Sequence, residues 1–209
     1  MSVARRVAAV SALVFAILCA ANAAQPKMTA TVGAWTLMSD EIDLKTAGGD
    51  FSVPHPLTMT RTDGSTVQAD RATGNWKKKT ATLYGHVSVH DVSGTFGLKN
   101  STGGSRGPAT LTTDQLQLDD IARVYDAQGH VHYVQGETTV DAQRAHLNDI
   151  THRLDLSGGV HAVQGERTLE SQTATYNTIT GEGEADGNAT LIFPGAAPTF
   201  ATPKPIVIH

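Results

Sequence analysis

Histidines are the residues of this chain whose type and spacing could support chemistry. His130 and His132 stand two residues apart, which places both on one face of a strand, and His161 takes the place of His132 in a similar later segment. Imidazole nitrogens bind zinc, so neighbouring strands could bring these side chains into a metal site. No acidic or cysteine ligand repeats with them, however, and Ser88 and Thr190 stand at the equivalent of His132 in two other places. We therefore expect solvated histidines on a strand surface and no metal.

Acidic and basic clusters give little support to catalysis. Asp119 and Asp120 form an acidic pair in a turn-like stretch, and Asp141 and Glu170 fall at equivalent places of two similar segments, but solvated charge explains all four. The basic run 77–79 could meet anionic sugar phosphates or form a solvated turn. The chain has no phosphate-loop or His-Glu-x-x-His motif. We expect a protein that is not an enzyme and uses no cofactor.

These residues lie in a repeat with a period of about 29 residues, which is within the range of stacked repeat proteins. Residues 129–137 and 158–166 are identical at seven of nine positions. Each unit opens with a threonine and has a glycine at a constant distance from it, in the pairs Thr66 and Gly85, Thr110 and Gly129, Thr139 and Gly158, and Thr168 and Gly187. One repeated unit cannot bury its own apolar face, so the units must stack into an elongated body.

Each unit reads as two strands. Apolar and polar residues alternate through residues 153–163, as in a half-buried strand. The preceding stretch changes phase near Gln143 and Arg144, which predicts a bulge, and residues 148–152 predict a tight turn. One glycine per unit suits a bend or bulge where strands turn a corner. No stretch keeps a helical period, so the sequence predicts an all-β fold.

The chain divides into three parts. Arg5 and Arg6, the apolar run 7–21 and the sequence Ala-Asn-Ala at 21–23 have the order of a secretory signal, so we expect residues 1–23 to be removed and the product to be exported. An uncleaved anchor is the alternative, although the run is shorter than the roughly 20 residues that span a bilayer. Residues 24–193 are expected to form one domain with a Gly/Ser-rich loop at 93–108, and residues 194–209 a proline-rich tail.

Composition limits the ligand class. Removing Arg5 and Arg6 from the 16 basic residues leaves 14 against 20 acidic residues, which disfavours a nucleic-acid ligand. The only cysteine, Cys19, lies in the expected signal, so stability must come from packing and strand pairing and not from disulfides.

The inward positions of the repeat are mostly small or aliphatic, and only 5% of the chain is aromatic. Two facing sheets with such side chains either leave a methyl-lined slot suited to an acyl chain or pack against each other in a dry core. For the slot, the expected lining residues are Val67, Leu83, Val87, Val89, Leu111, Val131, Tyr133, Val140, Leu154, Leu156, Val160, Leu169 and Leu191.

Two stretches carry a resemblance to a known family. Residues 139–145 followed by 154–160, and residues 64–72 followed by 81–89, resemble OstA-like repeats, in which the second strand ends in Leu-x-Gly-x-Val. This is the family of LptA, LptC and the N-terminal domain of LptD, and the resemblance covers about residues 51–193.

The resemblance implies a twisted antiparallel β-jellyroll, open along one side, that shields lipopolysaccharide acyl chains between the inner and outer membranes. It also implies partners: lipopolysaccharide or a similar glycolipid, and other OstA-like proteins or further copies joined head to tail by pairing of edge strands. The expected processing site favours the soluble LptA type over the anchored LptC type. The alternative function is a structural or adhesive β-repeat protein that binds no ligand.

Overall fold

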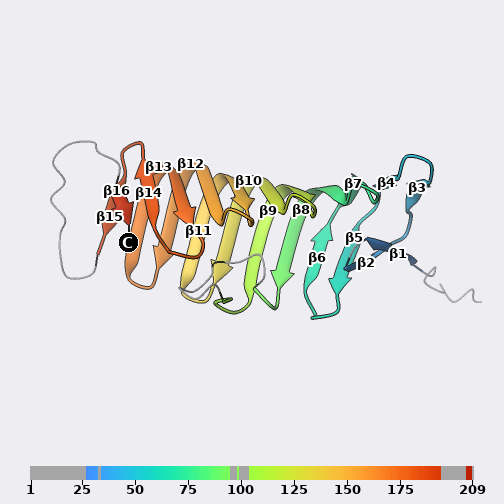
Figure 1. Ribbon diagram of the computed structural model, residues 1–209, viewed down its shortest axis with the longest axis horizontal. Coiled ribbons are helices and arrows are strands. Elements are labelled where there is room, and N and C mark those ends of the chain that lie inside the picture. The colour runs from blue at the N-terminus through green and yellow to red at the C-terminus, as the bar shows by residue number, and fades with distance from the viewer. Residues whose placement is uncertain (1–26, 33, 95–97, 99–103, 194–205, 209) are drawn as a thin grey trace, which may run out of the picture.

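The computed structural model describes residues 27–32, 34–94, 98, 104–193 and 206–208, so the expected signal at 1–23 lies outside the described residues. All regular structure in this part is β (Figure 1). The strands are β1 (Met28–Val32), β2 (Trp35–Ser39), β3 (Asp43–Lys45), β4 (Asp50–Val53), β5 (Leu57–Arg61), β6 (Thr66–Ala69), β7 (Arg71–Asn75), β8 (Thr80–Asp91), β9 (Ala109–Asp119), β10 (Val124–Gln135), β11 (Thr138–Asn148), β12 (Arg153–Gln164), β13 (Arg167–Asn177), β14 (Gly183–Asp186), β15 (Thr190–Ile192) and β16 (Ile206–Ile208). None of the described residues forms a helix that could cross a bilayer.

All strands belong to one antiparallel sheet along the long axis of the molecule (Figure 1). Its main path runs in the order β1, β2, β5, β6, β8 to β14 and β16, while β7 and β4 extend from β8, β3 pairs with β4, and β15 pairs with β13. Strands β8 to β13 pair in succession, and each has 11 or 12 residues. Residues 28–61, which precede the first repeat, form β1 to β5 and extend the same sheet. The predicted all-β fold of stacked antiparallel strands is confirmed.

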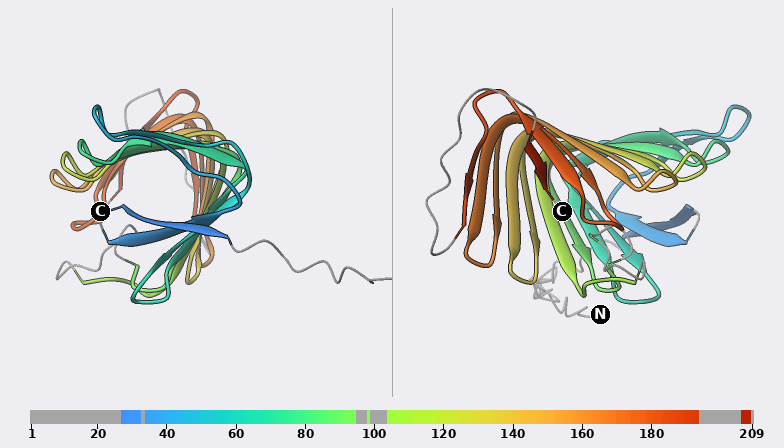
Figure 2. Two further views of the ribbon diagram at one scale, coloured as in Figure 1. Left: turned by 90° about the vertical axis from the view of Figure 1, so that its right-hand side faces the viewer. Right: turned by 60° about the vertical axis from the view of Figure 1, so that its left-hand side comes forward.

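Each long strand bends near its middle, so the sheet folds into two layers that remain open along one side (Figure 2). Pairing shifts register at these bends, between Tyr84 and Val87, between Gln128 and Val131, and between Ser157 and Val160. The shift on β11 lies between Asp141 and Arg144, which confirms the predicted bulge. The repeated glycines therefore lie at the corner of the fold, as their spacing predicted.

The corner needs glycine for two reasons. Gly129 has a φ of 79°, in the left-handed region that side chains disfavour. A Cβ at Gly129 would also lie 2.3 Å from an oxygen of Asp114 on β9, a contact that real Cβ atoms do not make. Backbone conformation and close strand approach thus both select the same residue.

The hairpin turns on one side of the sheet share one design. Asn148 Oδ1 accepts hydrogen bonds from the amides of Ile150 and Thr151 at 3.1 and 3.0 Å. Asp119 and Asn177, which hold the same position in the preceding and following units, accept the equivalent pairs of hydrogen bonds. The Asx side chain therefore satisfies the amides of the turn, and the predicted turn at 148–152 is confirmed.

The core lies between the two layers in two clusters. The larger cluster belongs to β2 to β10 and includes Leu37, Val53 and Leu83, each at most 1% exposed. The smaller cluster belongs to β11 to β14 and contains Val140, Leu156 and Val160. Both are held mainly by aliphatic side chains on the inward face of the alternating pattern.

Candidate functional site

Two adjoining cavities lie between the layers. The first has a volume of about 170 Å³ and is bounded by strands from β2 to β12, and the second, of about 120 Å³, lies further toward β15. Leu98, Val140, Leu154 and Leu156 line both cavities, so the two cavities adjoin, and we refer to them together as the apolar channel.

Eleven of the thirteen residues predicted to line a slot do line one of these cavities. Val67, Val89, Leu111, Val131, Tyr133, Val140, Leu154 and Leu156 line the first, and Val160, Leu169 and Leu191 line the second. Leu83 and Val87 instead belong to the packed core beside the channel, at 0% and 1% exposure.

Several lining residues were missed by the sequence prediction. Trp35 and Met59 come from β2 and β5, upstream of the recognisable repeat, and Leu98 belongs to the segment between β8 and β9. Two further aromatic residues, Tyr125 and Trp35, also line the first cavity. Tyr125 sits one residue after the start of β10, where the alternation alone indicates an inward position.

The two tyrosines of the first cavity report its low polarity. Burial raises the pKa of Tyr133 to about 12, and burial together with the nearby Asp149 raises the pKa of Tyr125 to about 12. The Tyr133 hydroxyl donates to Gln135 Oε1 at 2.7 Å and accepts from the Leu98 amide at 3.2 Å. The phenol thus holds Leu98 at the point where the two cavities meet.

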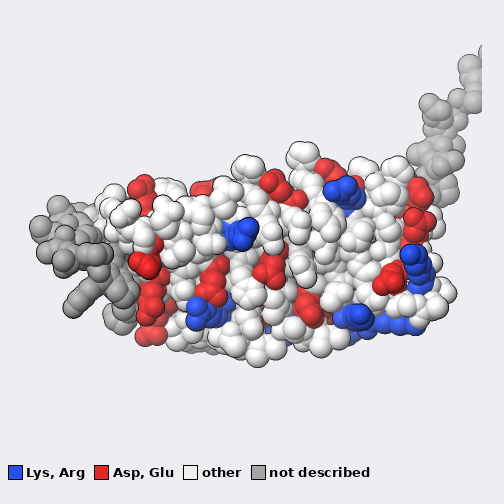
Figure 3. Space-filling view, turned by 90° about the horizontal axis from the view of Figure 1, so that it is seen from above, with Lys and Arg blue, Asp and Glu red and all other residues white. Residues whose placement is uncertain are grey.

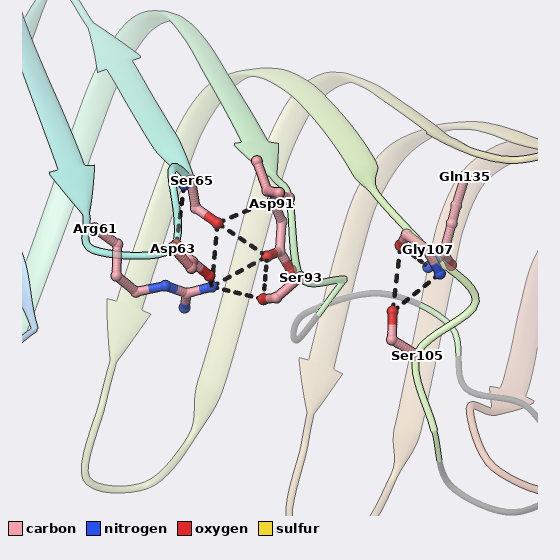
Figure 4. A network of polar contacts seen from close by, with 9 residues as sticks. Arg61, Asp63, Ser65, Asp91, Ser93, Ser105, Gly107 and Gln135 are labelled. Atoms are coloured by element: carbon pink, nitrogen blue, oxygen red, sulfur yellow. Dashed lines mark hydrogen bonds and ion pairs between the residues drawn. The ribbon is translucent and has the colours of Figure 1, made fainter.

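One rim of the open side carries a buried polar network (Figure 4). Asp91, at the end of β8, lines the first cavity and is 2% exposed. Its Oδ1 accepts hydrogen bonds from Arg61, Ser65 and Ser93 at 3.2, 3.3 and 2.9 Å. The Arg61 guanidinium also covers the Trp35 ring at 5.2 Å and, by hydrogen bonding, lowers the pKa of Asp63. The network joins the β5–β6 turn to β8 and offsets the cost of burying a carboxylate.

The opposite rim consists of the turns 76–79, 120–123, 149–152 and 178–182, which we call the turn rim. Lys79, Asp120 and Thr178 of this rim line the first cavity. Ile121 and Ile150 at the tips are 65% and 59% exposed, although turn tips usually carry polar residues or glycine. The channel therefore opens beside a row of solvent-facing aliphatic side chains.

The basic run 77–79 is divided in the structure. Lys79 lines the first cavity, whereas the Lys77 ammonium donates to the Ala47 carbonyl at 2.7 Å and lies over the Trp76 ring. Only part of the run is therefore placed at the channel.

His130, His132 and His161 are exposed on the outer face of the sheet. The expectation that no acidic residue repeats with them was wrong. Acidic side chains do accompany them, since His132 Nδ1 lies 2.6 Å from Asp141, and His161 lies 3.7 Å from Glu170. The antiparallel register places these residues opposite each other, which spacing within a single strand does not reveal. Among the described residues, no group of three or more His, Cys, Asp or Glu side chains is arranged to hold a metal ion.

The charged side chains of the outer surface are of mixed sign. On the face shown in Figure 3, Lys and Arg are interspersed with Asp and Glu, with no large block of positive charge. Such a surface gives no footprint for a polyanion on this face.

Comparison with known proteins identifies the family of this chain. A similar solved structure is that of LptH, described as the LptA homologous periplasmic component of the conserved lipopolysaccharide transport device from Pseudomonas aeruginosa. It has 19% sequence identity and a TM-score of 0.47, over 69% of this chain and 94% of LptH. No curated protein matches the sequence. The model of the family described as lipopolysaccharide-assembly, LptC-related matches residues 31–163, which confirms the resemblance seen in the repeats. The chain therefore belongs to the LptC-related family of lipopolysaccharide-assembly proteins.

Proposed function

We propose that this protein carries lipopolysaccharide, or a related envelope glycolipid, through the periplasm with acyl chains held in the apolar channel. The observation that carries this proposal is the channel itself, which the same repeat positions line in successive units. Family membership supports the cargo class, and the secretory pattern of residues 1–23 supports the compartment and the soluble, LptA-like form.

The channel offers enough binding energy for a lipid. Each methylene moved from water to an apolar site contributes about 0.8 kcal/mol, so ten methylenes contribute on the order of 8 kcal/mol before ordering costs. Two polar side chains of the channel already have hydrogen-bond partners, since Asp91 accepts three hydrogen bonds and Tyr133 makes two. An acyl chain entering there strands few polar groups without a partner.

The rims suit a cargo with a polar head. An acyl chain can lie between the layers while its headgroup stays in water at the open side, and Ile121 and Ile150 offer apolar contact to a chain that enters past the turn rim. Because most of the channel lining is apolar, affinity changes little along the channel, so directed passage needs an energy source outside this protein.

Partners follow from the two ends of the sheet. A sheet that does not close leaves strand edges whose amides and carbonyls can pair with another chain. We propose that other OstA-like proteins, or further copies of this one, extend the channel in this way.

Adjacent residues on β9 provide the test. Leu111 is half-buried and lines the first cavity, whereas Thr112 is exposed and does not line it. We expect Leu111→Asp to lose at least tenfold of its affinity for a fluorescent acyl probe, while Thr112→Asp keeps it. Lipid extracted from the purified parent and identified by mass spectrometry should be a glycolipid with acyl chains. A folded Leu111→Asp variant that binds the probe like the parent would favour a structural β-repeat protein instead.

A further inference from the structure

The end of the sheet near the C-terminus is built from unusually short strands. β13 has 11 residues, but β14 covers only Thr173 to Tyr176 of it and β15 only Thr168 to Glu170. β16, which comes later in the chain, pairs with β14, and the two lie beside each other at the left end of Figure 1. The tail thus occupies the edge of β14, one of the edges at this end of the sheet where a strand of another chain could pair.

This cover is weak in physical terms. It consists of three pairs, Gly183 with Ile208, Glu184 with Val207, and Ala185 with Ile206. A backbone hydrogen bond contributes about 1 kcal/mol net, and ordering a residue costs about 1–2 kcal/mol of backbone entropy. Three pairs barely offset the ordering of the tail residues that make them. By comparison, β8 and β9 pair at ten positions.

We propose that β16 is a removable cover that competes with assembly: a second copy of this chain displaces it and pairs its own edge strand with β14. The inference rests on the proposed function, because it concerns how the extended channel is controlled. The incoming strand is β1 of the second copy. β1 is the last strand at the other end of the path through the sheet, pairs only with β2 among the described strands, and at five residues is longer than β16. A longer strand can fill all four positions of β14, where β16 fills three.

A reversible lock tests the competition. Glu184 and Val207 are register partners in an antiparallel pair. Because the Cα atoms of such partners are as close as a disulfide requires, cysteines introduced together by Glu184→Cys and Val207→Cys can form a disulfide. The native chain adds no competing thiol once Cys19 is removed with the signal. We expect the oxidised variant to stay monomeric at every concentration in light scattering, and the same sample after reduction to associate like the parent. The control pair His132→Cys and Asp141→Cys joins register partners within the body of the sheet and should leave association unchanged.

Removal of the cover tests the opposite direction. A chain ending at Pro205 should associate at a concentration at least tenfold lower than the parent. Adding Thr31→Pro in β1 should return the truncated chain to the monomer, because proline removes an amide donor from an edge strand. A truncated chain no more associated than the parent, or a locked chain that assembles like the reduced one, would overturn the competition, and association that survives Thr31→Pro would overturn the assignment of β1.

The lipid content of the same samples distinguishes a failure of this inference from a failure of the proposed function. Lipid extracted from the truncated protein should match that of the parent, because the truncation removes none of the residues that line the first or the second cavity. Lost lipid with normal assembly would count against the carrier, and retained lipid with unaltered assembly would count against the cover.

Discussion

His86 Nδ1 lies 2.8 Å from a carboxylate oxygen of Asp70 at the corner where the sheet folds. His130 and Asp114 repeat this arrangement one unit later at 2.7 Å. In both units the histidine follows the corner glycine and shares its left-handed backbone. The repeated unit therefore includes a side-chain contact between neighbouring strands as well as a backbone bend.

This contact makes stability depend on pH. The hydrogen bond from His86 to Asp70, with the charge of that carboxylate, raises the pKa of His86. A pKa raised on folding stabilises the protein fully below the unfolded value of about 6.5, and the contribution is lost as pH rises through the folded value. We expect His86→Gln to lower the melting temperature at pH 5.5 and to match the parent at pH 8.5. The decrease is small because the ring is 92% exposed.

The matched control is His90→Gln, an exposed histidine on the same strand. It should not reproduce the difference between the two pH values in thermal melts. An equal loss for His86→Gln at both pH values would show that the contact with Asp70 is not what titrates.

Replacement of the corner glycine should be more costly than replacement of a turn glycine. Gly129 and Gly136 both have positive φ, but a Cβ would clash with Asp114 only at Gly129 and would meet nothing within 4 Å at Gly136. We expect Gly136→Ala to cost about 1–2 kcal/mol from backbone strain, and Gly129→Ala to cost at least about 1 kcal/mol more. Urea unfolding of the two variants measures the difference, and equal losses would contradict the role of the close contact.

Leu83 should be a core residue and not a ligand contact. Its side chain is fully buried and packed in the larger cluster, so Leu83→Ala should lower the free energy of unfolding by about 2–5 kcal/mol. Leu44→Ala, at a leucine 53% exposed, should change it by less than about 0.5 kcal/mol. At a temperature where both variants are folded, the affinity for an acyl probe should be that of the parent. Weaker binding by folded Leu83→Ala would place Leu83 in the channel after all.

Tyr133 should hold Leu98 in place between the cavities. Tyr133→Phe keeps the ring and removes the oxygen that accepts the Leu98 amide, so the free energy of unfolding should fall by about 1–3 kcal/mol. Amide exchange at Leu98 should become faster, while exchange at Val140, on the neighbouring strand, stays unchanged. Unchanged exchange at Leu98 would mean that the hydrogen bond does not restrain it.

Local signals explain what could be predicted of the fold. The turn at 148–152 and the bulge near Gln143 and Arg144 depend on residues close together in the chain, and the glycine spacing marks the corner. The alternation of apolar residues also identified most of the channel lining. It could not separate Leu83 and Val87 from the other inward residues, because alternation reports the direction of a side chain and not the space in front of it.

The sequence by itself determined the repeat, the strand pattern, the corner glycines and the apolar inner face, since all of these follow from period and residue type. Only the tertiary structure decided that cavities remain between the layers, that Trp35, Met59 and Leu98 help to line them, and that the tail returns to cover β14. The same holds for the pairing of His132 with Asp141. These features depend on contacts between residues distant in the chain, and both the register across strands and the volume between layers arise only when the sheet has folded.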